Sequence, residues 1–466
     1  MSIPQFSVWD STDCLRVHEA SLALLEDPGV EVKYGPAVEV LADLGARIEG
    51  TRVKIGADLV DRALSSAPRQ ATVRSRDHAS LLTLAQGHSY FGPGSDCLYI
   101  TDPETGLRRR AVLTDVEGIA ALCERLENID FVMSMGLPED VPQAIDDIAQ
   151  VAAMLRGTRK PLLVAPRNGA VLTAMREMAA LCGEADSLMI YAMPSPPLMH
   201  DEDALSKVMG CAELGIPLIY APAPATGGTG PASLASVITV GNAEVLSGLV
   251  VHQAVEPGAP FVYGAGCGVL NLRTALDVYA VPEHFLGNQA ACELARFYGL
   301  PSFAYASVSD AKCVDEQLCA EYAFTALLGA LSGATLLHDV GYMESGLRSS
   351  YETIILGNEL VGFARAFLRD CRVDSDSLAL AEILDVGPGG NHLARPLTRA
   401  AHRGYWQPDL IDHSTYDRWH AGGERTLATR MRARRDELLA AERPFRLSED
   451  TSRQLDGLLT EAMARR

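Results

Sequence analysis

Short apolar runs alternate with helical patterns over the central part of the chain. The runs lie at 97–100, 129–135, 161–165, 188–193, 216–221, 260–264, 302–306 and 334–338. Patterns of helical periodicity fill the gaps at 114–127, 141–156, 169–183, 202–214, 231–255, 274–298, 315–331 and 349–369. The gaps are long enough for helical crossovers between parallel strands.

Eight such units in sequence favour an α/β fold of the closed (β/α)8 TIM barrel type, with an open doubly wound sheet as the alternative. We expect the barrel to occupy residues 91–370. Residues 1–90 mix helical patterns with a hairpin at 46–55 and predict an N-terminal α+β cap. Residues 371–466 are polar and helical, and predict a C-terminal helical extension. Its charged helix from about 422 is either a solvated surface element or a subunit contact.

Tyrosines gather where the predicted strands end. Tyr99, Tyr191, Tyr220, Tyr263 and Tyr305 lie at or near five strand ends, and Tyr342 lies in the loop after the eighth strand. Active sites of such barrels form at the C-terminal ends of the strands. Inward-facing tyrosines would offer π faces to a cation. The alternative is that half of them point outward beneath helices, since side chains alternate along a strand.

Other candidate groups occupy the same predicted edge. His338 ends the eighth strand, Glu344 follows it, and Arg167 and Lys312 follow the third and seventh strands. The segment Gly227, Gly228, Thr229 and Gly230 precedes a long helix and could hold an anion, or form only a tight turn. Gly264–Gly268 lacks the third glycine of a dinucleotide fingerprint. The spacing of His, Cys and Asp predicts no metal site, and no G-x-S-x-G hydrolase motif occurs.

Composition and charge exclude some classes of binding partner and indicate the cellular compartment. The formal charge is −20 over 466 residues, which argues against nucleic acid and anionic membranes. The ten cysteines are scattered without a C-x-x-C pair, as is typical of a reducing cytoplasm. The N-terminus shows no signal-peptide pattern, and the apolar stretch 323–337 is too short to span a bilayer. We therefore expect a cytoplasmic protein.

Several segments resemble the trimethylamine methyltransferase family of corrinoid-dependent enzymes, which includes glycine betaine demethylating members. They are ATGGTGPASLASVITVGNAEVLSGLVVHQAVEPGAPFVYG (225–264), ARFYGLPSFAYASVSDAKCVDEQ (295–317), ALSGATLLHDVGYMESGLRSSYE (330–352), VGPGGNHLARPLT (386–398) and VHEASLALLEDPGVEV (17–32). The resemblance implies a TIM barrel, a methylated amine substrate and a homo-oligomer. It also implies cobalamin held by a separate corrinoid protein, with no cofactor bound in this chain.

Trimethylamine-using members carry pyrrolysine, which this sequence of standard residues lacks. A tertiary amine must be activated before it loses a methyl group, whereas a quaternary ammonium expels a neutral amine directly. The resemblance therefore implies a quaternary amine such as glycine betaine, whose methyl group passes to cob(I)alamin.

Roles for the candidate residues follow from this reading. His338, Tyr305 and Glu344 are the expected catalytic residues. The expected substrate-binding residues are Tyr99, Tyr191, Tyr220, Tyr263, Tyr342, Arg167 and Lys312. A betaine carboxylate needs a hydrogen-bond donor. His338 is the first candidate, and Arg167, Lys312 and Arg348 are the others. The glycine loop 227–230 would admit the corrin ring. The alternatives are a non-catalytic quaternary-amine binding protein, and another TIM-barrel enzyme acting on a small metabolite.

Overall fold

The centre of the molecule is a closed barrel of parallel strands. A computed structural model describes residue 4 and residues 6–264 and 266–464. Its barrel strands are β6 (Tyr90–Phe91), a single bridge at Val132, β9 (Leu162–Val164), β10 (Leu188–Ala192), β12 (Leu218–Tyr220), β13 (Phe261–Tyr263), β16 (Phe303–Tyr305) and β17 (Leu336–His338). Parallel pairing runs from Val132 through β9, β10, β12, β13 and β16 to β17, which pairs with β6. The Asp130 amide donates to the Phe91 carbonyl of β6 at 2.7 Å and closes the ring. The predicted TIM barrel is confirmed.

The identity of the first strand differs from the prediction. The run 97–100 was expected to open the barrel, but β6 takes that place. The later run forms β7 (Tyr99–Thr101), which pairs with β8 (Arg108–Arg110) and β18 (Arg348–Ser349) outside the barrel. The expectation was wrong because the sequence at β6 has only two apolar residues, which stand between polar residues and the segment Gly92-Pro93-Gly94 and give no apolar run.

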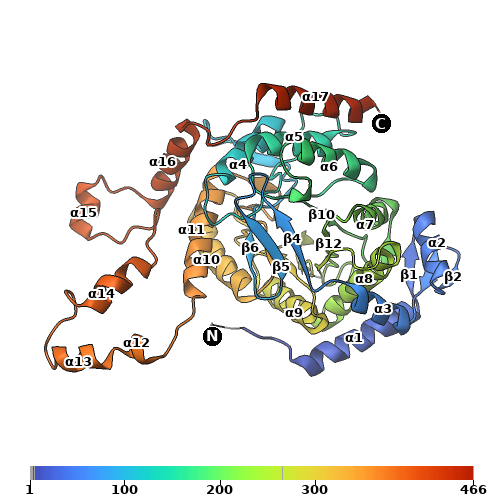
Figure 1. Cartoon of the computed structure of the whole chain (residues 1–466), viewed down its shortest axis with the longest axis horizontal. Coiled ribbons are helices and arrows are strands. Elements are labelled where there is room, and N and C mark those ends of the chain that lie inside the picture. The colour runs from blue at the N-terminus through green and yellow to red at the C-terminus, as the bar shows by residue number, and fades with distance from the viewer. Residues whose placement is uncertain (1–3, 5, 265, 465–466) are drawn as a thin grey trace.

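Helices surround the barrel (Figure 1). They are α4 (Leu113–Cys123), α5 (Asp146–Gly157), α6 (Leu172–Leu181), α7 (Glu202–Leu214), α8 (Leu234–Val255), α9 (Pro282–Tyr298), α10 (Glu316–Leu331) and α11 (Tyr351–Phe367). By length and composition alone, α8 could cross a membrane. Its apolar character has another explanation, because most of it is buried among α1, α3, α7 and α9.

Side chains that point into the barrel form their own core cluster. Phe131, Met189, Val262, Phe303 and Leu336 belong to it, whereas the residues next to them along the strands pack against the helices. The hairpin β4 (Gln70–Arg74) and β5 (Leu81–Ala85) adds Val73, Leu82 and Leu84 to the same cluster. The hairpin therefore fills the N-terminal end of the barrel.

The N-terminal segment packs against the outside of the barrel. It contains α1 (Ser11–Glu26), β1 (Val30–Val32), α2 (Gly35–Asp43), β2 (Arg47–Glu49), β3 (Arg52–Lys54) and α3 (Ala57–Ser66). Strand β1 pairs with β11 (Met199–His200), which follows barrel strand β10. Helices α1 and α3 pack on α8. Pairing and packing thus join this segment to the barrel wall.

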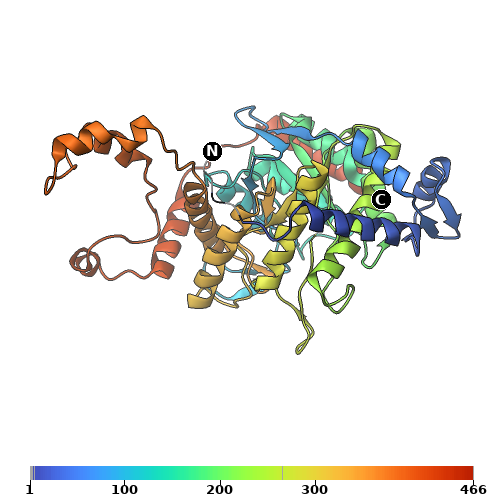
Figure 2. The same ribbon diagram turned by 90° about the horizontal axis from the view of Figure 1, so that it is seen from below.

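The C-terminal extension has one part that packs on the barrel and one that does not. It contains α12 (Ser375–Leu378), α13 (Leu380–Val386), α14 (Pro396–Ala401), α15 (Tyr416–Ala421), α16 (Leu427–Ala440) and α17 (Glu449–Ala464). Helix α16 packs on α11, and α17 packs on α5 and α6. The segment that holds α12 to α15 stands away from the barrel in both ribbon views (Figures 1 and 2).

The hairpin that fills the barrel gives a stability prediction. Leu84 is fully buried, so we expect Leu84→Ala to lower the free energy of unfolding by about 2–5 kcal/mol. The control is Leu81→Ala on the same strand, where the side chain is 44% exposed and the change should stay within about 0.5 kcal/mol. Urea denaturation measures both. Equal effects of the two substitutions would contradict the packing of this hairpin inside the barrel.

Candidate active site

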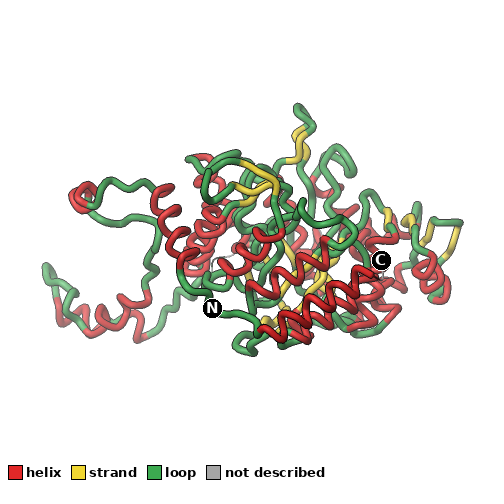
Figure 3. Tube along the Cα trace, turned by 90° about the horizontal axis from the view of Figure 1, so that it is seen from above, coloured by secondary structure: helices red, strands yellow, loops and turns green. Residues whose placement is uncertain are grey.

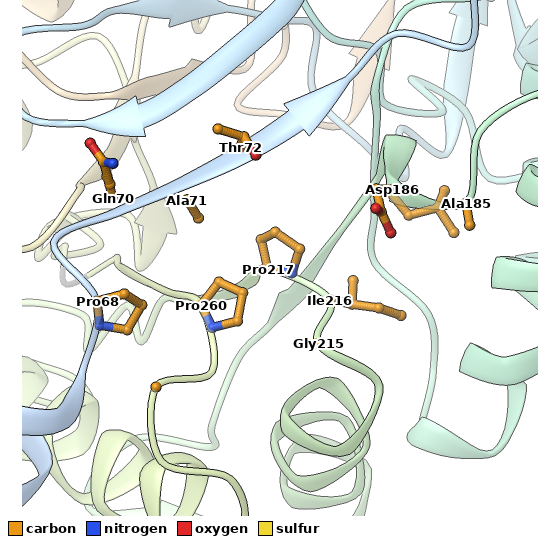
Figure 4. A pocket seen from close by; sticks show the side chains of 12 residues that line it. Pro68, Gln70, Ala71, Thr72, Ala185, Asp186, Gly215, Ile216, Pro217 and Pro260 are labelled. Atoms are coloured by element: carbon orange, nitrogen blue, oxygen red, sulfur yellow. The ribbon is translucent and has the colours of Figure 1, made fainter.

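The two ends of the barrel differ in chemistry. A pocket at the N-terminal end is lined by Pro68, Ala71, Pro217 and Pro260, with Asp186 as its single ionisable side chain (Figure 4). This pocket offers little reactive chemistry. Catalytic groups of such barrels lie at the opposite, C-terminal end, where the polar aromatic side chains gather.

Three strands place aromatic rings inside the C-terminal end. Tyr305 on β16 and His338 on β17 are register partners, with ring centroids 4.8 Å apart. Phe303 lies beneath and stacks on His338 at 4.0 Å. Tyr191 on β10 lies 6.1 Å from His338 and 5.3 Å from Phe303. Tyr191, Tyr305 and His338 therefore form the inward-facing layer at this end.

Loop residues enlarge this layer. The Tyr279 ring meets Tyr305 and Tyr342 edge to face, at 6.2 Å and 6.5 Å. His284, in the first turn of α9, lies 4.7 Å from Tyr305 and 5.2 Å from Tyr279. We call Tyr191, Tyr279, Tyr305, Tyr342, His284 and His338 the aromatic cluster.

Burial keeps the phenols of this cluster neutral. It raises the pKa values of Tyr191, Tyr279, Tyr305 and Tyr342 above that of a free phenol, and the charge of Asp339 raises them further. Burial lowers the pKa of His284 to about 4. At neutral pH these groups present uncharged rings.

Two carboxyl groups adjoin the cluster. Asp339 follows β17 in a left-handed backbone conformation, is 2% exposed, and has its Oδ1 2.5 Å from His338 Nδ1. Asp96 also has a positive φ angle, and protein around its carboxyl group raises its pKa although the side chain keeps accessible surface. The cluster thus lies beside acidic groups.

The loop after β6 sets the position of Tyr342. The Tyr342 hydroxyl accepts a hydrogen bond from the Ser95 amide at 2.8 Å and donates one to the Ser95 carbonyl. A side chain at Gly94 would collide with the Tyr342 ring and would lie 2.7 Å from Asp339 Oδ1. Only glycine allows this close approach.

Several buried polar atoms here lack hydrogen-bond partners among the residues that the structure describes. They are both ring nitrogens of His284 and His338, Asp339 Oδ1 and Ser307 Oγ. The 2.5 Å contact between His338 and Asp339 does not have hydrogen-bond geometry. Buried polar groups are normally paired, so a concentration of unpaired ones marks a place where a ligand or water completes the set.

Two predicted tyrosines lie on the other face of the barrel wall. The Tyr220 hydroxyl is 2.6 Å from His200 Nδ1, and the Tyr263 hydroxyl donates to Asn242 Oδ1 at 2.8 Å. Both side chains are buried between strands and helices. Strand alternation directs them away from the cluster, as the alternative reading allowed.

Other predicted residues lie at the rim and are engaged there. Glu344 pairs with Arg108 at 2.7 Å, and the Arg108 guanidinium covers the Tyr99 ring at 3.3 Å. Arg167 pairs with Asp146, and Lys312 donates to the Asp310 carbonyl at 2.6 Å. The four predicted residues here are therefore outside the aromatic cluster: Tyr99, Arg167, Lys312 and Glu344.

The glycine loop forms a tight turn. The Gly227 amide donates to the Gly230 carbonyl at 2.8 Å, and Thr229 Oγ1 accepts from the Ala225 amide. The turn ends before α8, whose N-cap is Ser233. The structure therefore separates these residues from the start of the helix, and its contacts match the tight-turn reading.

Sequence reasoning placed Asp96 and Asp339 at strand ends without giving them a role, and it did not identify Tyr279 or His284 as site residues. Tyr279 and His284 were read as part of one helix at 274–298, whereas α9 begins at Pro282. The proline at the first helical position is the signal that could have placed this boundary. Among the described residues, no group of three or more His, Cys, Asp or Glu could hold a metal ion.

Comparison with known proteins places this arrangement in a family. The family model described as trimethylamine methyltransferase (MTTB) matches residues 1–466. The chain belongs to this methyltransferase family. The barrel is therefore that of a family methyltransferase.

Relatives and solved structures agree with the assignment. Glycine betaine methyltransferase of Desulfitobacterium hafniense is 30% identical over 98% of each chain. Trimethylamine methyltransferase MttB of Methanosarcina barkeri is 30% identical over 97% of this chain and 94% of its own. The crystal structure of the M. barkeri monomethylamine methyltransferase MtmB has a TM-score of 0.52 at 13% identity, covering 99% of this chain and 88% of that one. The last similarity concerns the fold alone.

The environment of His284 gives a pH prediction. A folded-state pKa of about 4, against 6.5 for a free imidazole, means that the unfolded chain binds the proton more tightly. The free energy of unfolding should therefore fall as the pH drops from 6.5 toward 4, by at most about 1.4 kcal/mol per pH unit from this group. His284→Gln should make that dependence shallower. Denaturant titrations across this range measure it, and an NMR titration of His284 near pH 6.5 would contradict the assignment.

Proposed function

We propose that this enzyme removes a methyl group from a quaternary amine and delivers it to the corrinoid of a partner protein. The observation that carries the proposal is the cluster of neutral phenol rings beside acidic groups at the C-terminal end of the barrel. Family membership supplies the reaction class, and a glycine betaine methyltransferase is among the relatives.

The cluster has the chemistry of a quaternary ammonium site. A trimethylammonium group donates no hydrogen bond, so its recognition depends on π faces and on diffuse negative charge. Tyr191, Tyr279 and Tyr305 supply three rings that each retain some accessible surface. Asp339 and Asp96 supply the negative potential. An anionic substrate would meet repulsion here, which disfavours the alternative enzyme acting on an anionic metabolite.

The reaction needs little proton chemistry from the protein. When bound, the partner's reduced corrinoid supplies the nucleophile that takes the methyl group. The C–N bond breaks, and its electron pair remains on the nitrogen as a neutral tertiary amine. The chain's residues hold the ammonium group in line and exclude water. The positive charge of the ammonium group and the electron-rich nucleophile neutralise each other in this step, so the transition state is less charged than the reactants. Weakly polar surroundings made of neutral rings therefore favour the transition state.

Access for the partner comes from the rim around the cluster. Exposed apolar side chains follow the C-terminal ends of four different barrel strands: Leu107, Met193, Leu272, Leu276 and Leu347. The short hairpin β14 (Leu270–Asn271) and β15 (Leu276–Asp277) stands out from this rim (Figures 2 and 3). We assign this rim to contact with the corrinoid protein, in place of the glycine turn 227–230.

A betaine carboxylate would depend on His338 for its donor. Arg167 and Lys312 are held at the rim, and Arg348 donates to Thr101 and to the Lys312 carbonyl. In the described part of the chain, neither ring nitrogen of His338 has a hydrogen-bond partner. His338 and His284 are therefore the two cluster side chains with hydrogen-bonding capacity to spare, and we assign the carboxylate to His338 because it lies beside Tyr191 and Tyr305 in the inward-facing layer.

The experiment that tests the function is anaerobic methyl transfer. The protein is mixed with glycine betaine and reduced free cobalamin, and loss of the reduced cobalamin absorbance is followed together with the demethylated amine. We expect both changes with a quaternary amine and neither with acetate. Binding of the amine without transfer, also when a corrinoid protein is supplied, would indicate a binding protein instead.

Tyr305 separates ring from hydroxyl contributions. Tyr305→Phe keeps the π face and should retain the rate within about tenfold, whereas Tyr305→Ala should lower kcat/KM by at least about tenfold through loss of a cation contact. The control is Tyr263→Phe on the outward face, which should lower stability by about 1 kcal/mol and leave kcat/KM unchanged. Equal losses of activity for Tyr305→Ala and Tyr263→Phe would contradict the site.

Asp339 gives a prediction that separates binding from chemistry. Its carboxylate attracts the full charge of the bound cation more than the partial charge of the transition state. Asp339→Asn should therefore raise KM for the quaternary amine about tenfold, with kcat unchanged or higher. Steady-state kinetics at saturating corrinoid measures both. A fall in kcat at constant KM would show instead that Asp339 acts in the chemical step.

A further inference from the structure

The Tyr279 ring belongs to a segment of the rim that is neither helix nor strand. Residues 278–281 form this segment and connect the hairpin β14–β15 to α9, which begins at Pro282. Residues 271–277 of the hairpin are all exposed, so the hairpin gives the segment little support from the barrel. The place of the Tyr279 ring in the aromatic cluster therefore depends on contacts that other loops make with residues 278–281.

The carboxylate of Asp310, in the loop after β16, makes such contacts. Its Oδ1 accepts a hydrogen bond from the Tyr279 amide at 3.0 Å, and its Oδ2 accepts one from the Ala280 amide at 3.0 Å. The Tyr279 amide also lies 3.2 Å from Oδ2. Hydrogen bonds from backbone amides to an ionised carboxylate are among the stronger ones in proteins. Asp310 therefore anchors the backbone at the residue whose side chain enters the cluster.

Asp310 is itself held by two further elements. The Ser345 hydroxyl, in the loop after β17, donates to Asp310 Oδ1 at 2.7 Å. Glu321 on α10 accepts from the Asp310 amide at 2.9 Å and from the Ser309 hydroxyl at 2.6 Å. Asp310 thus joins the loops that follow β13, β16 and β17. A carboxylate fixed in this way is a rigid support for residues 278–281.

The number of donors explains why this position needs a carboxylate. Two amides and one hydroxyl converge on Asp310. An ionised carboxylate can accept all of them, whereas an asparagine has one acceptor oxygen and an NH2 group that would face a donor. Loss of the side chain leaves the two amides without this partner. The Tyr279 ring would then hold its place against Tyr305 and Tyr342 less firmly.

We infer that Asp310 is a positioning residue for methyl transfer, because its carboxylate holds the Tyr279 backbone so that the ring faces the bound ammonium group. This inference rests on the proposed quaternary-amine site. A ring that is fixed before the substrate arrives loses no further freedom on binding, so the cation contact is realised in full. A mobile ring weakens binding more than it slows the chemical step, because the ammonium charge is largest before that step.

Steady-state kinetics with glycine betaine at saturating corrinoid tests this role. We expect Asp310→Ala to raise KM about tenfold, with kcat changed much less. Asp310→Asn should raise KM less, since it retains one acceptor oxygen. The matched control is Asp315→Ala in the same loop, where the carboxylate caps α10 and accepts from the Leu318 amide. That substitution should lower the melting temperature and leave KM unchanged.

A double-mutant cycle distinguishes positioning from a direct effect of the Asp310 charge on the substrate. In a Tyr279→Ala background no ring remains to be held, so Asp310→Ala should then change KM by less than about twofold. Additive effects of the two substitutions on KM would overturn the inference. An unchanged KM in Asp310→Ala, with Tyr279→Ala impaired, would overturn it as well. Circular dichroism melting shows whether each variant is folded, and Asp310→Asn replaces Asp310→Ala in the cycle if the latter is not.

Amide hydrogen exchange tests the contact without any substrate. The Tyr279 and Ala280 amides should exchange at least about tenfold faster in Asp310→Ala than in the wild type. In Asp315→Ala, the Leu318 amide should lose protection while Tyr279 and Ala280 keep theirs. Unchanged exchange at Tyr279 and Ala280 in Asp310→Ala would overturn the inference. Absence of methyl transfer by the wild type, with exchange as expected, would contradict the proposed function and leave Asp310 as the residue that fixes the segment.

Discussion

The site depends on one geometric constraint, the alternation of side chains along closed parallel strands. Each barrel strand has one face toward the interior and one toward the helices. In β16 and β17 this rule brings Tyr305 and His338 together inside the barrel. In β12 and β13 the same rule sends Tyr220 and Tyr263 outward, where their hydroxyls stabilise contacts with neighbouring elements. A shift of one residue in either register would exchange these roles.

Closure of the barrel also sets the electrostatics of its mouth. The hairpin β4–β5 fills the opposite end, and the interior layer of Phe131, Met189 and Phe303 lies between that hairpin and the cluster. The phenols of Tyr191 and Tyr305 stay neutral because burial disfavours their charged form. Neutral rings with acidic groups nearby suit a cation whose charge disappears during the reaction. Stability and chemistry thus have the same physical origin, which is exclusion of water.

The extension beyond α11 shows two ways in which polar helical sequence is used. Helix α16 is charged along its length, yet Met431 and Leu438 are buried and Arg435 pairs with Glu352 on α11. The prediction of a solvated or subunit-contact helix therefore missed its attachment to its own barrel. The segment 371–426 before it instead exposes apolar side chains such as Leu384 and Leu393, and its helices α12 to α15 contain no buried residue.

The sequence by itself determined the barrel, because seven of its eight strand positions lie in apolar runs and the helical crossovers between them are regular. It also located His338, Tyr191 and Tyr305 at strand ends, since position along a strand is a local property. Tertiary structure decided which tyrosines face inward, because register depends on pairing between strands distant in sequence. It brought Tyr279, Asp96 and Asp339 to the cluster through loops without periodicity, and His284 through the first turn of α9. It also held Arg167, Glu344 and Lys312 at the rim, through contacts that no local pattern encodes.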